Sequence, residues 1–256
     1  LYVLKDKSDQ IAIIDTRDNR MKQTATITVE DVSEIQEMYL DIERNQLIAV
    51  CDGYVGGKWN DDDYGYGQKI NTTAVTYDIS DRADPKEVGR VSQSGYYNSS
   101  RIADGYLYLF SDYYVTLDGI TAKNPKSYIP LVNDNLIKET DICLPSISKA
   151  DMYSIITSVS LENPDETAHS KAFLADGGNL YVSNDNIYFY ENVWQYSGKD
   201  VTTIRKVSYE SGKLTAGAQC KIDGYINDSF SIDEYDGYLR VVVTDGDTNS
   251  VYVLDQ

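Results

Sequence analysis

The chain contains very little histidine, cysteine, tryptophan and proline. Its 256 residues include one His, three Cys, two Trp and five Pro. One imidazole cannot supply the several nitrogen ligands of a multi-histidine metal site. Cys51, Cys143 and Cys220 are odd in number and far apart, so they indicate neither a disulfide framework nor a zinc-ligand cluster. We expect Cys51 and Cys220 to be small apolar side chains within strands.

Positive charge and long apolar runs are also scarce. The chain has 23 basic and 41 acidic residues, which give a formal net charge of −18. Such a surface repels phosphate backbones and anionic lipid, so we expect no nucleic-acid partner. No apolar run approaches the roughly 20 residues of a membrane span, so we expect no direct membrane insertion by this segment. An acidic surface instead favours solubility.

The common signatures of enzymes are missing as well. The sequence has no Gly-x-Ser-x-Gly motif, and the Gly-x-Gly at 65–67 follows no strand-to-helix pattern. A hydrolase triad needs a nucleophile, a base and an orienting acid that converge in space. We interpret His169, the single histidine, as a surface or strand-end residue. The sequence therefore predicts that the chain is not an enzyme.

Tyrosine and short apolar strands, in contrast, are abundant. The chain has 23 Tyr against 4 Phe, and tyrosine favours half-exposed β-sheets. Four stretches look like copies of one hairpin, in which a short strand meets a turn of Asp, Asn, Glu or Gly and returns as an apolar strand. Asp-Gly and Asn-Asp suit tight turns because they tolerate positive φ. The four stretches are residues 38–50, 100–110, 180–190 and 231–243.

The order of these hairpins predicts an all-β propeller. No segment keeps a helical period over three turns, and a second strand pair follows each repeated hairpin, so that two pairs make one four-stranded antiparallel blade. We predict a single domain over 1–256 with about five blades, which form a partial or truncated propeller. The predicted blades are 1–30, 34–95, 96–175, 178–223 and 226–256, with insertions at 53–69 and 113–150. In the second insertion the prolines favour an extended crossing rather than a strand.

Two acidic segments are candidate calcium sites, because Ca²⁺ takes about 6–8 oxygen ligands. Asp61, Asp62 and Asp63 lie in a glycine-containing inserted loop, and Asp245 and Asp247 follow the last repeated hairpin. The spacing is not that of an EF-hand, and a solvated acidic loop is the alternative interpretation. The sequence indicates no cofactor other than this calcium.

Aromatic residues in two predicted loops are candidate ligand contacts. Trp59, Tyr64 and Tyr66 lie in the first insertion, and Trp194 and Tyr196 lie in a later loop. Loops on a rigid scaffold commonly carry binding residues. Exposed aromatic rings beside acids and amides stack on sugars or peptides. The alternative is that each Trp caps the open end of its own blade.

Seven short motifs follow one another along nearly the whole chain. They are YDISDRADPK at 77–86, GYYNSSR at 95–101, YIP at 128–130, LYVS at 180–183, TI at 203–204, GYIN at 224–227 and FSIDEYDGYLR at 230–240. This set resembles a family of secreted bacterial and archaeal proteins with a C-terminal β-propeller domain. The resemblance implies an exported or membrane-anchored protein that continues with further blades beyond this segment. It transfers no catalytic residue, because the family has no established catalytic motif.

Three functions follow as hypotheses. We expect an extracellular or surface-attached propeller that is not catalytic and presents loops to a protein, peptide or glycan ligand. The alternatives are a carboxylate-based carbohydrate-active or peptide-cleaving enzyme, which needs two facing acids roughly 5–10 Å apart, and a support domain of a larger surface protein. The best-placed acids are Asp233, Glu234 and Asp236. Their plain interpretation is that Asp236 and Gly237 form the turn, while Asp233 or Glu234 pairs with Arg240.

Overall fold

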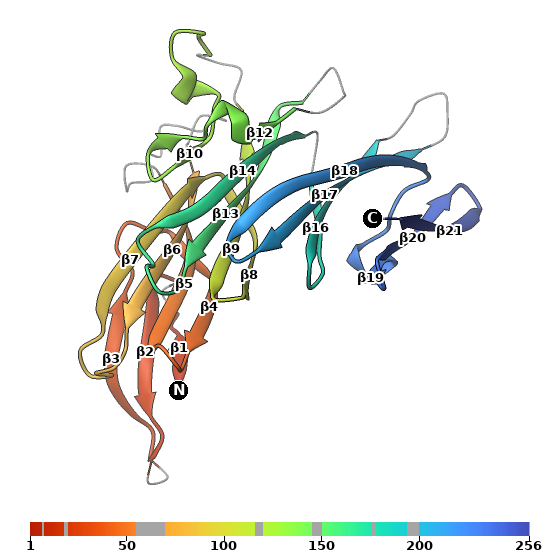
Figure 1. Ribbon diagram of the computed structural model, residues 1–256. Coiled ribbons are helices and arrows are strands. Elements are labelled where there is room, and N and C mark those ends of the chain that lie inside the picture. The colour runs from red at the N-terminus through yellow and green to blue at the C-terminus, as the bar shows by residue number, and fades with distance from the viewer. Residues whose placement is uncertain are drawn as a thin grey trace.

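The strands form five separate sheets that follow one another along the chain, and nearly all neighbouring strands are antiparallel (Figure 1). The computed structural model describes residues 1–6, 8–17, 20–54, 70–115, 120–144, 150–175, 178–193 and 200–255. In Figure 1 the sheets stand side by side, from the first at the N-terminus to the fifth at the C-terminus. The described parts of the first and fifth sheets lie at opposite ends of an open arc (Figure 1). The predicted all-β class is confirmed.

The first two sheets come from the N-terminal part of the chain, and a later hairpin extends the edge of the second. The first contains β1 (Tyr2–Leu4), β2 (Gln10–Asp15) and β3 (Lys22–Thr28). The second contains β4 (Glu34–Asp41), β5 (Gln46–Tyr54), β6 (Ile70–Asp78), β7 (Lys86–Ser94), β10 (Leu131–Val132) and β11 (Asn135–Leu136).

The other three sheets follow in chain order, and among the described strands β12 and β14 form the one parallel pair. The third contains β8 (Tyr96–Ala103), β9 (Tyr106–Tyr114), β12 (Ile142–Cys143), β13 (Met152–Ser160) and β14 (Thr167–Ala175). The fourth contains β15 (Asn179–Val182), β16 (Asn186–Val193), β17 (Val201–Glu210) and β18 (Lys213–Asp223). The fifth contains β19 (Ile232–Tyr235), β20 (Tyr238–Asp245) and β21 (Thr248–Asp255).

Helical structure in the described residues is limited to short 3-10 turns. None of the described helical segments has the length and apolar character needed to cross a bilayer. The turns are η2 (Pro125–Ser127), η3 (Glu139–Asp141) and η4 (Ser229–Ser231).

The repeated hairpins use the predicted turn residues. Asp104 and Gly105 have φ of 50° and 78°, and Asp236 and Gly237 have φ of 53° and 77°. Both pairs join strands across two-residue turns, which is the geometry that positive φ permits. The turn of the hairpin at 180–190 is stabilised differently. The Ser183 hydroxyl accepts hydrogen bonds from the backbone amides of Asp185 and Asn186.

The core lies between the sheets, and β5 shows how. Leu47, Ala49 and Cys51 pack against the first sheet, whereas Ile48 and Val50 pack against the third. All five are fully buried. A strand that is covered on both faces is apolar at every position, whereas a strand with one solvent-exposed face alternates between apolar and polar residues. Burial of each aliphatic side chain stabilises the fold by roughly 1.5–3 kcal/mol, and burial raises the pKa of the Cys51 thiol to about 12.

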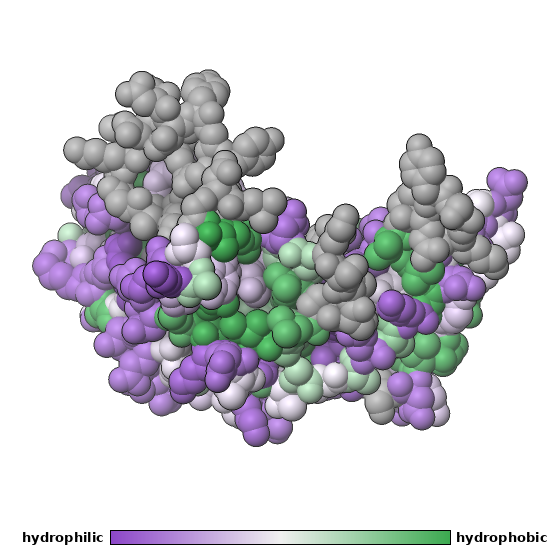
Figure 2. Space-filling model, turned by 90° about the horizontal axis from the view of Figure 1, so that it is seen from above, coloured by the Kyte–Doolittle hydropathy of each residue, from purple (hydrophilic) through white to green (hydrophobic). Residues whose placement is uncertain are grey.

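The same alternation recurs along the arc, so that every pair of successive sheets shares one apolar cluster. This face-to-face stacking is that of propeller blades. Seen from above, apolar side chains gather across the middle of the visible surface, with hydrophilic ones around much of its margin (Figure 2). The fifth sheet is covered on one face only, since Val251 and Val253 are 67% and 60% exposed on the other.

A repeated polar contact, which we call the inter-sheet clasp, accompanies the apolar stacking. In three sheets an Asp or Asn near the end of the second main strand lies within hydrogen-bonding distance of a hydroxyl on the next strand. The pairs are Asp52 with Thr72 (3.3 Å), Asp112 with Ser154 (3.0 Å) and Asn192 with Thr202 (2.8 Å).

Two of these clasps reach into the following sheet. Asp52 accepts a hydrogen bond from the Tyr97 backbone amide at 2.8 Å, and Asn192 accepts one from the Ile226 amide at 3.1 Å. The Thr202 hydroxyl also lies 2.7 Å from the Gly224 carbonyl, in the segment that links the fourth and fifth sheets. The clasp therefore holds the first residues of one sheet against the end of the preceding one.

The second insertion corrects one prediction. Instead of an extended crossing without strands, it contributes β10 and β11 to the second sheet and β12 to the third. The cause is a tight turn at Asn133 and Asp134, which have φ of 46° and 60°. The Asn133 side chain accepts a hydrogen bond from the Ser92 amide and so attaches the hairpin to β7.

The clasp can be tested with Thr202→Val. Valine keeps the side-chain volume but removes the hydroxyl, and with it the hydrogen bond to Asn192 or to the buried Gly224 carbonyl. We expect a loss of about 1–3 kcal/mol in the free energy of unfolding, measured by chemical denaturation. The control is Thr215→Val on the exposed edge strand β18, which we expect to change stability by less than about 0.5 kcal/mol. Equal effects of the two substitutions would contradict the clasp.

Candidate functional site

Most of the predicted site residues lie outside the described part of the chain. These are the loop aromatics Trp59, Tyr64, Tyr66, Trp194 and Tyr196, and the acids Asp61, Asp62 and Asp63.

The other two predicted calcium ligands lie at the last hairpin turn. Asp245 ends β20, and Asp247 is in the turn to β21, where Gly246 has φ of 56°. The described residues contain no group of three or more His, Cys, Asp or Glu side chains placed to hold a metal ion. In the described part of the chain, these two acids therefore belong to a turn and not to such a group.

A cavity of about 790 Å³, which we call the inner cavity, opens between the third, fourth and fifth sheets. The first strand of each of these sheets, namely β8, β15 and β19, lies at a sheet edge and borders the cavity. Three consecutive sheets therefore converge on one hollow. Its lining consists of Asn98, Ser99, Gly178, Asn179, Leu180, Tyr181, Val182, Ser229, Phe230, Ile232 and Asp233.

Asp112 lies directly behind the lining. It accepts hydrogen bonds from Asn98 Nδ2 at 2.6 Å and from Ser154 Oγ at 3.0 Å. Gly178 passes over this pair, because a Cβ at that position would lie 2.6 Å from Ser154 Oγ and 3.4 Å from Asp112 Oδ1. Burial raises the pKa of Asp112, although the two hydrogen bonds oppose this rise. Thus the clasp of the third sheet lies directly behind the cavity lining.

Phe230 stands at the rim and is 96% exposed. The turn η4 positions it, since the Asp228 carboxylate accepts a hydrogen bond from the Phe230 amide at 3.0 Å. The ring is therefore open to solvent at the mouth of the cavity and is available for contact with a ligand.

The acids of the last repeated hairpin form the turn and the ion pair that the sequence predicts. Asp233 pairs with Arg240 at 2.9 Å, and the Arg240 guanidinium lies 5.2 Å from the centre of the Tyr235 ring. Glu234 points to the other face and accepts a hydrogen bond from Asn186 Nδ2 at 2.6 Å, as well as one from the Ser183 hydroxyl. Glu234 therefore connects the fifth sheet to the fourth.

The interpretation of His169 needs correction. It is not a simple surface residue but the third residue of β14, and it is half-buried. Its Nδ1 accepts a hydrogen bond from the Leu214 amide of the fourth sheet at 2.9 Å, and its Nε2 lies 3.4 Å from Asp141. Asp141 also pairs with the buried Lys171 at 3.1 Å. The imidazole thus joins two sheets, a role that no local pattern along the chain indicates.

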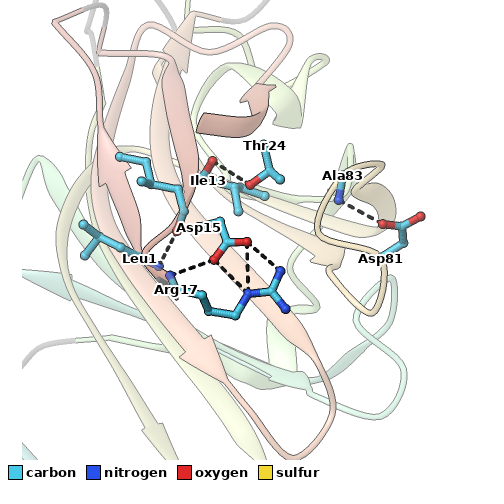
Figure 3. Close-up of polar contacts among 8 residues, drawn as sticks. Leu1, Ile13, Asp15, Arg17, Thr24, Asp81 and Ala83 are labelled. Carbon is cyan, nitrogen blue, oxygen red and sulfur yellow. Dashed lines mark hydrogen bonds and ion pairs between the residues drawn. The ribbon is translucent and has the colours of Figure 1, made fainter. Parts of the chain in front are cut away.

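A second hollow, of about 400 Å³, lies at the first sheet. Figure 3 shows that its polar groups bond to one another. Arg17 Nε donates to Asp15 Oδ1 at 2.9 Å, and the Thr24 hydroxyl donates to the Ile13 carbonyl at 3.1 Å. Hydrogen bonds from Arg17 hold the pKa of Asp15 well below its ordinary value. The inner cavity, with its exposed Phe230, is the better candidate for ligand contact.

The raised pKa of Asp112 predicts the sign of a pH effect. Because folding favours the protonated carboxyl, its contribution to stability is complete below the ordinary pKa of about 3.9 and is lost as pH rises through the raised value. Asp112→Asn removes this titration. We therefore expect the stability of the unsubstituted chain, relative to this variant, to fall as pH rises from about 4 to 7. Urea denaturation across that range measures it; a difference that stays constant, or matches that of the exposed-site control Asp165→Asn, would contradict the prediction.

Comparison with known proteins adds two archaeal relatives and one solved structure. An uncharacterised protein of Methanocaldococcus jannaschii is 35% identical over 81 residues, which cover 29% of this chain and 12% of that protein. An uncharacterised protein of Archaeoglobus fulgidus is 34% identical over 89 residues, which cover 34% of this chain and 14% of that protein. The matched part is thus a small share of either relative's length.

Among solved structures, the acylaminoacyl peptidase of Pyrococcus horikoshii aligns with 100% of this chain and 38% of its own, at a TM-score of 0.37 and 9% identity. A family model described as "Beta propeller domain" matches residues 1–256. Its match runs over the entire chain and agrees with the radial stacking of antiparallel sheets. The chain therefore belongs to the Beta propeller domain family.

Proposed function

We propose that this domain is not catalytic and that it binds a protein, peptide or glycan ligand in the inner cavity. The observation that carries the proposal is the convergence of three sheet edges on one open hollow, with the exposed Phe230 at its rim. Amide side chains of Asn98 and Asn179 lie in the same lining. Such a mixture of an aromatic ring and polar groups suits a ligand that has both an apolar face and hydrogen-bonding groups.

Binding is favoured over acid–base catalysis by the state of the nearby carboxylates. Asp233 is paired with Arg240, and Asp112 is held behind the lining by Asn98 and Ser154. Catalysis by two acids requires a pair that faces the substrate from opposite sides. Among the described lining residues, Asp233 is the single carboxylate.

We further propose that the domain acts outside the cell, in an exported or surface-attached protein. The strongly acidic composition, with a net charge of −18, supports this because it keeps a protein soluble and separate from other molecules. The resemblance to secreted propeller proteins supports the same location.

The binding role is tested with thermal-shift, peptide-array and glycan-array screens of the whole chain. We expect at least one ligand to raise the melting temperature. Phe230→Ala should weaken its affinity about 10-fold or more, since truncation of a central aromatic contact costs roughly 1.4 kcal/mol or more. The matched control is Tyr114→Ala, an exposed aromatic outside the cavity lining. Turnover of a glycoside or peptide that disappears in Asp233→Asn would overturn the proposal.

A further inference from the structure

We infer that the inner cavity binds a basic peptide, with a Lys or Arg side chain placed against Asp112 and Asp233. The inference rests on the proposed binding function and specifies its ligand. It follows from the charges around the cavity, from the exposed ring at its rim and from the backbone edges that border it.

The described lining residues carry charge of one sign, since they include Asp233 and no Lys, Arg or His. Asp112 lies one layer deeper and is hydrogen-bonded to the lining residue Asn98. Two cations adjoin the lining and are already engaged: Arg240 pairs with Asp233, and the Arg101 guanidinium donates to the carbonyl of the lining residue Val182. The net charge of −18 adds a long-range attraction for cations.

Asp112 lacks the partner that a buried carboxylate usually has. Its hydrogen bonds come from Asn98 and Ser154, which are both neutral. No ion pair involving Asp112 is present among the described residues. A partly desolvated carboxylate without a counterion is costly, and a cation brought close to it offsets that cost. Asp52, the corresponding acid of the second sheet, also has neutral donors, but it has three of them, from Gln36, Thr72 and the Tyr97 amide. In the fourth sheet the residue is the uncharged Asn192.

The rim offers further contacts for a cation. Arg240 holds Oδ2 of Asp233, while the Asp233 side chain remains 64% exposed. Phe230, in the same lining, presents an aromatic ring to solvent. A Lys or Arg side chain placed over such a ring is attracted to its face. Tyr235 and Arg240 already form this type of contact at 5.2 Å on the same hairpin.

The sheet edges favour a peptide over a small amine or a glycan. β8, β15 and β19 are each the last strand at one edge of their sheets, and all three border the cavity. Edge strands present unpaired backbone amides and carbonyls, which an extended peptide can bond along its length. A neutral glycan could donate hydrogen bonds to a carboxylate but would gain no charge–charge attraction from it.

The test uses the whole chain and three synthetic peptides of one length. These are a Gly-Lys repeat, the same peptide with every Lys acetylated, and a Gly-Glu repeat. By fluorescence anisotropy we expect only the Gly-Lys peptide to bind, with weaker affinity at higher salt. Acetylation should weaken binding about 10-fold or more, because it removes the positive charge. Equal affinity for the lysine and acetyl-lysine peptides would overturn the inference.

Three variants locate the effect. Asp233→Asn and Asp112→Asn should each reduce affinity for the lysine peptide several-fold, whereas Asp165→Asn, which removes an exposed charge outside the cavity lining, should not. Asp233 is exposed, so its variant remains informative if Asp112→Asn folds poorly. An equal loss in Asp165→Asn would show that only net charge matters and would overturn the inference.

The same measurements separate this inference from the binding function itself. If the acetylated peptide or a neutral oligosaccharide binds in a manner that depends on Phe230, while the lysine peptide does not bind, the charge inference fails and the binding function stands. If no peptide or oligosaccharide binds at the cavity, both fail.

Discussion

The structure depends on sheets that cannot cover their own apolar faces. In the second, third and fourth sheets the second main strand is mostly apolar and buried, so each of these sheets needs a neighbour on both faces. In β5, odd and even positions serve opposite neighbours, as Leu47 and Ile48 show. The hydrophobic effect therefore acts between sheets, and it sets the radial order of the whole arc.

This stacking also generates the inner cavity. The chain leaves each sheet and begins the next one on the same inner side of the arc. The clasp holds the connecting segment there through Asp52 or Asn192. The first strands of successive sheets then converge, and their outer backbone edges face a common space. In the third sheet, the clasp residue Asp112 has neutral partners and lies directly behind the lining of this space. The clasp thus stabilises the second and fourth sheets against the sheets that follow them. In the third sheet it places the carboxyl group of Asp112 next to the candidate site.

Local sequence signals predicted the hairpins because their causes are local. Asp104–Gly105 and Asp236–Gly237 tolerate positive φ, and the strands beside them are apolar. The turn at Asn133–Asp134 carries a signal of the same kind, yet the prolines of the insertion favoured an extended crossing. The structure shows that a two-residue strand forms there because a neighbouring edge, β7, was available to pair with it. Nothing within the segment itself specifies that partner.

The sequence by itself determined the strand pattern, the tight turns, the blade-like repetition and the acidic surface, since each arises from neighbouring residues or from composition. It also determined that Asp233 and Arg240, which lie on facing strands of one hairpin, could pair. Only the tertiary structure decided that His169 accepts a hydrogen bond from Leu214 and that Asn98, Gly178 and Phe230 border one cavity. The reason is that these residues belong to different sheets, and their meeting depends on how the sheets stack rather than on any spacing along the chain.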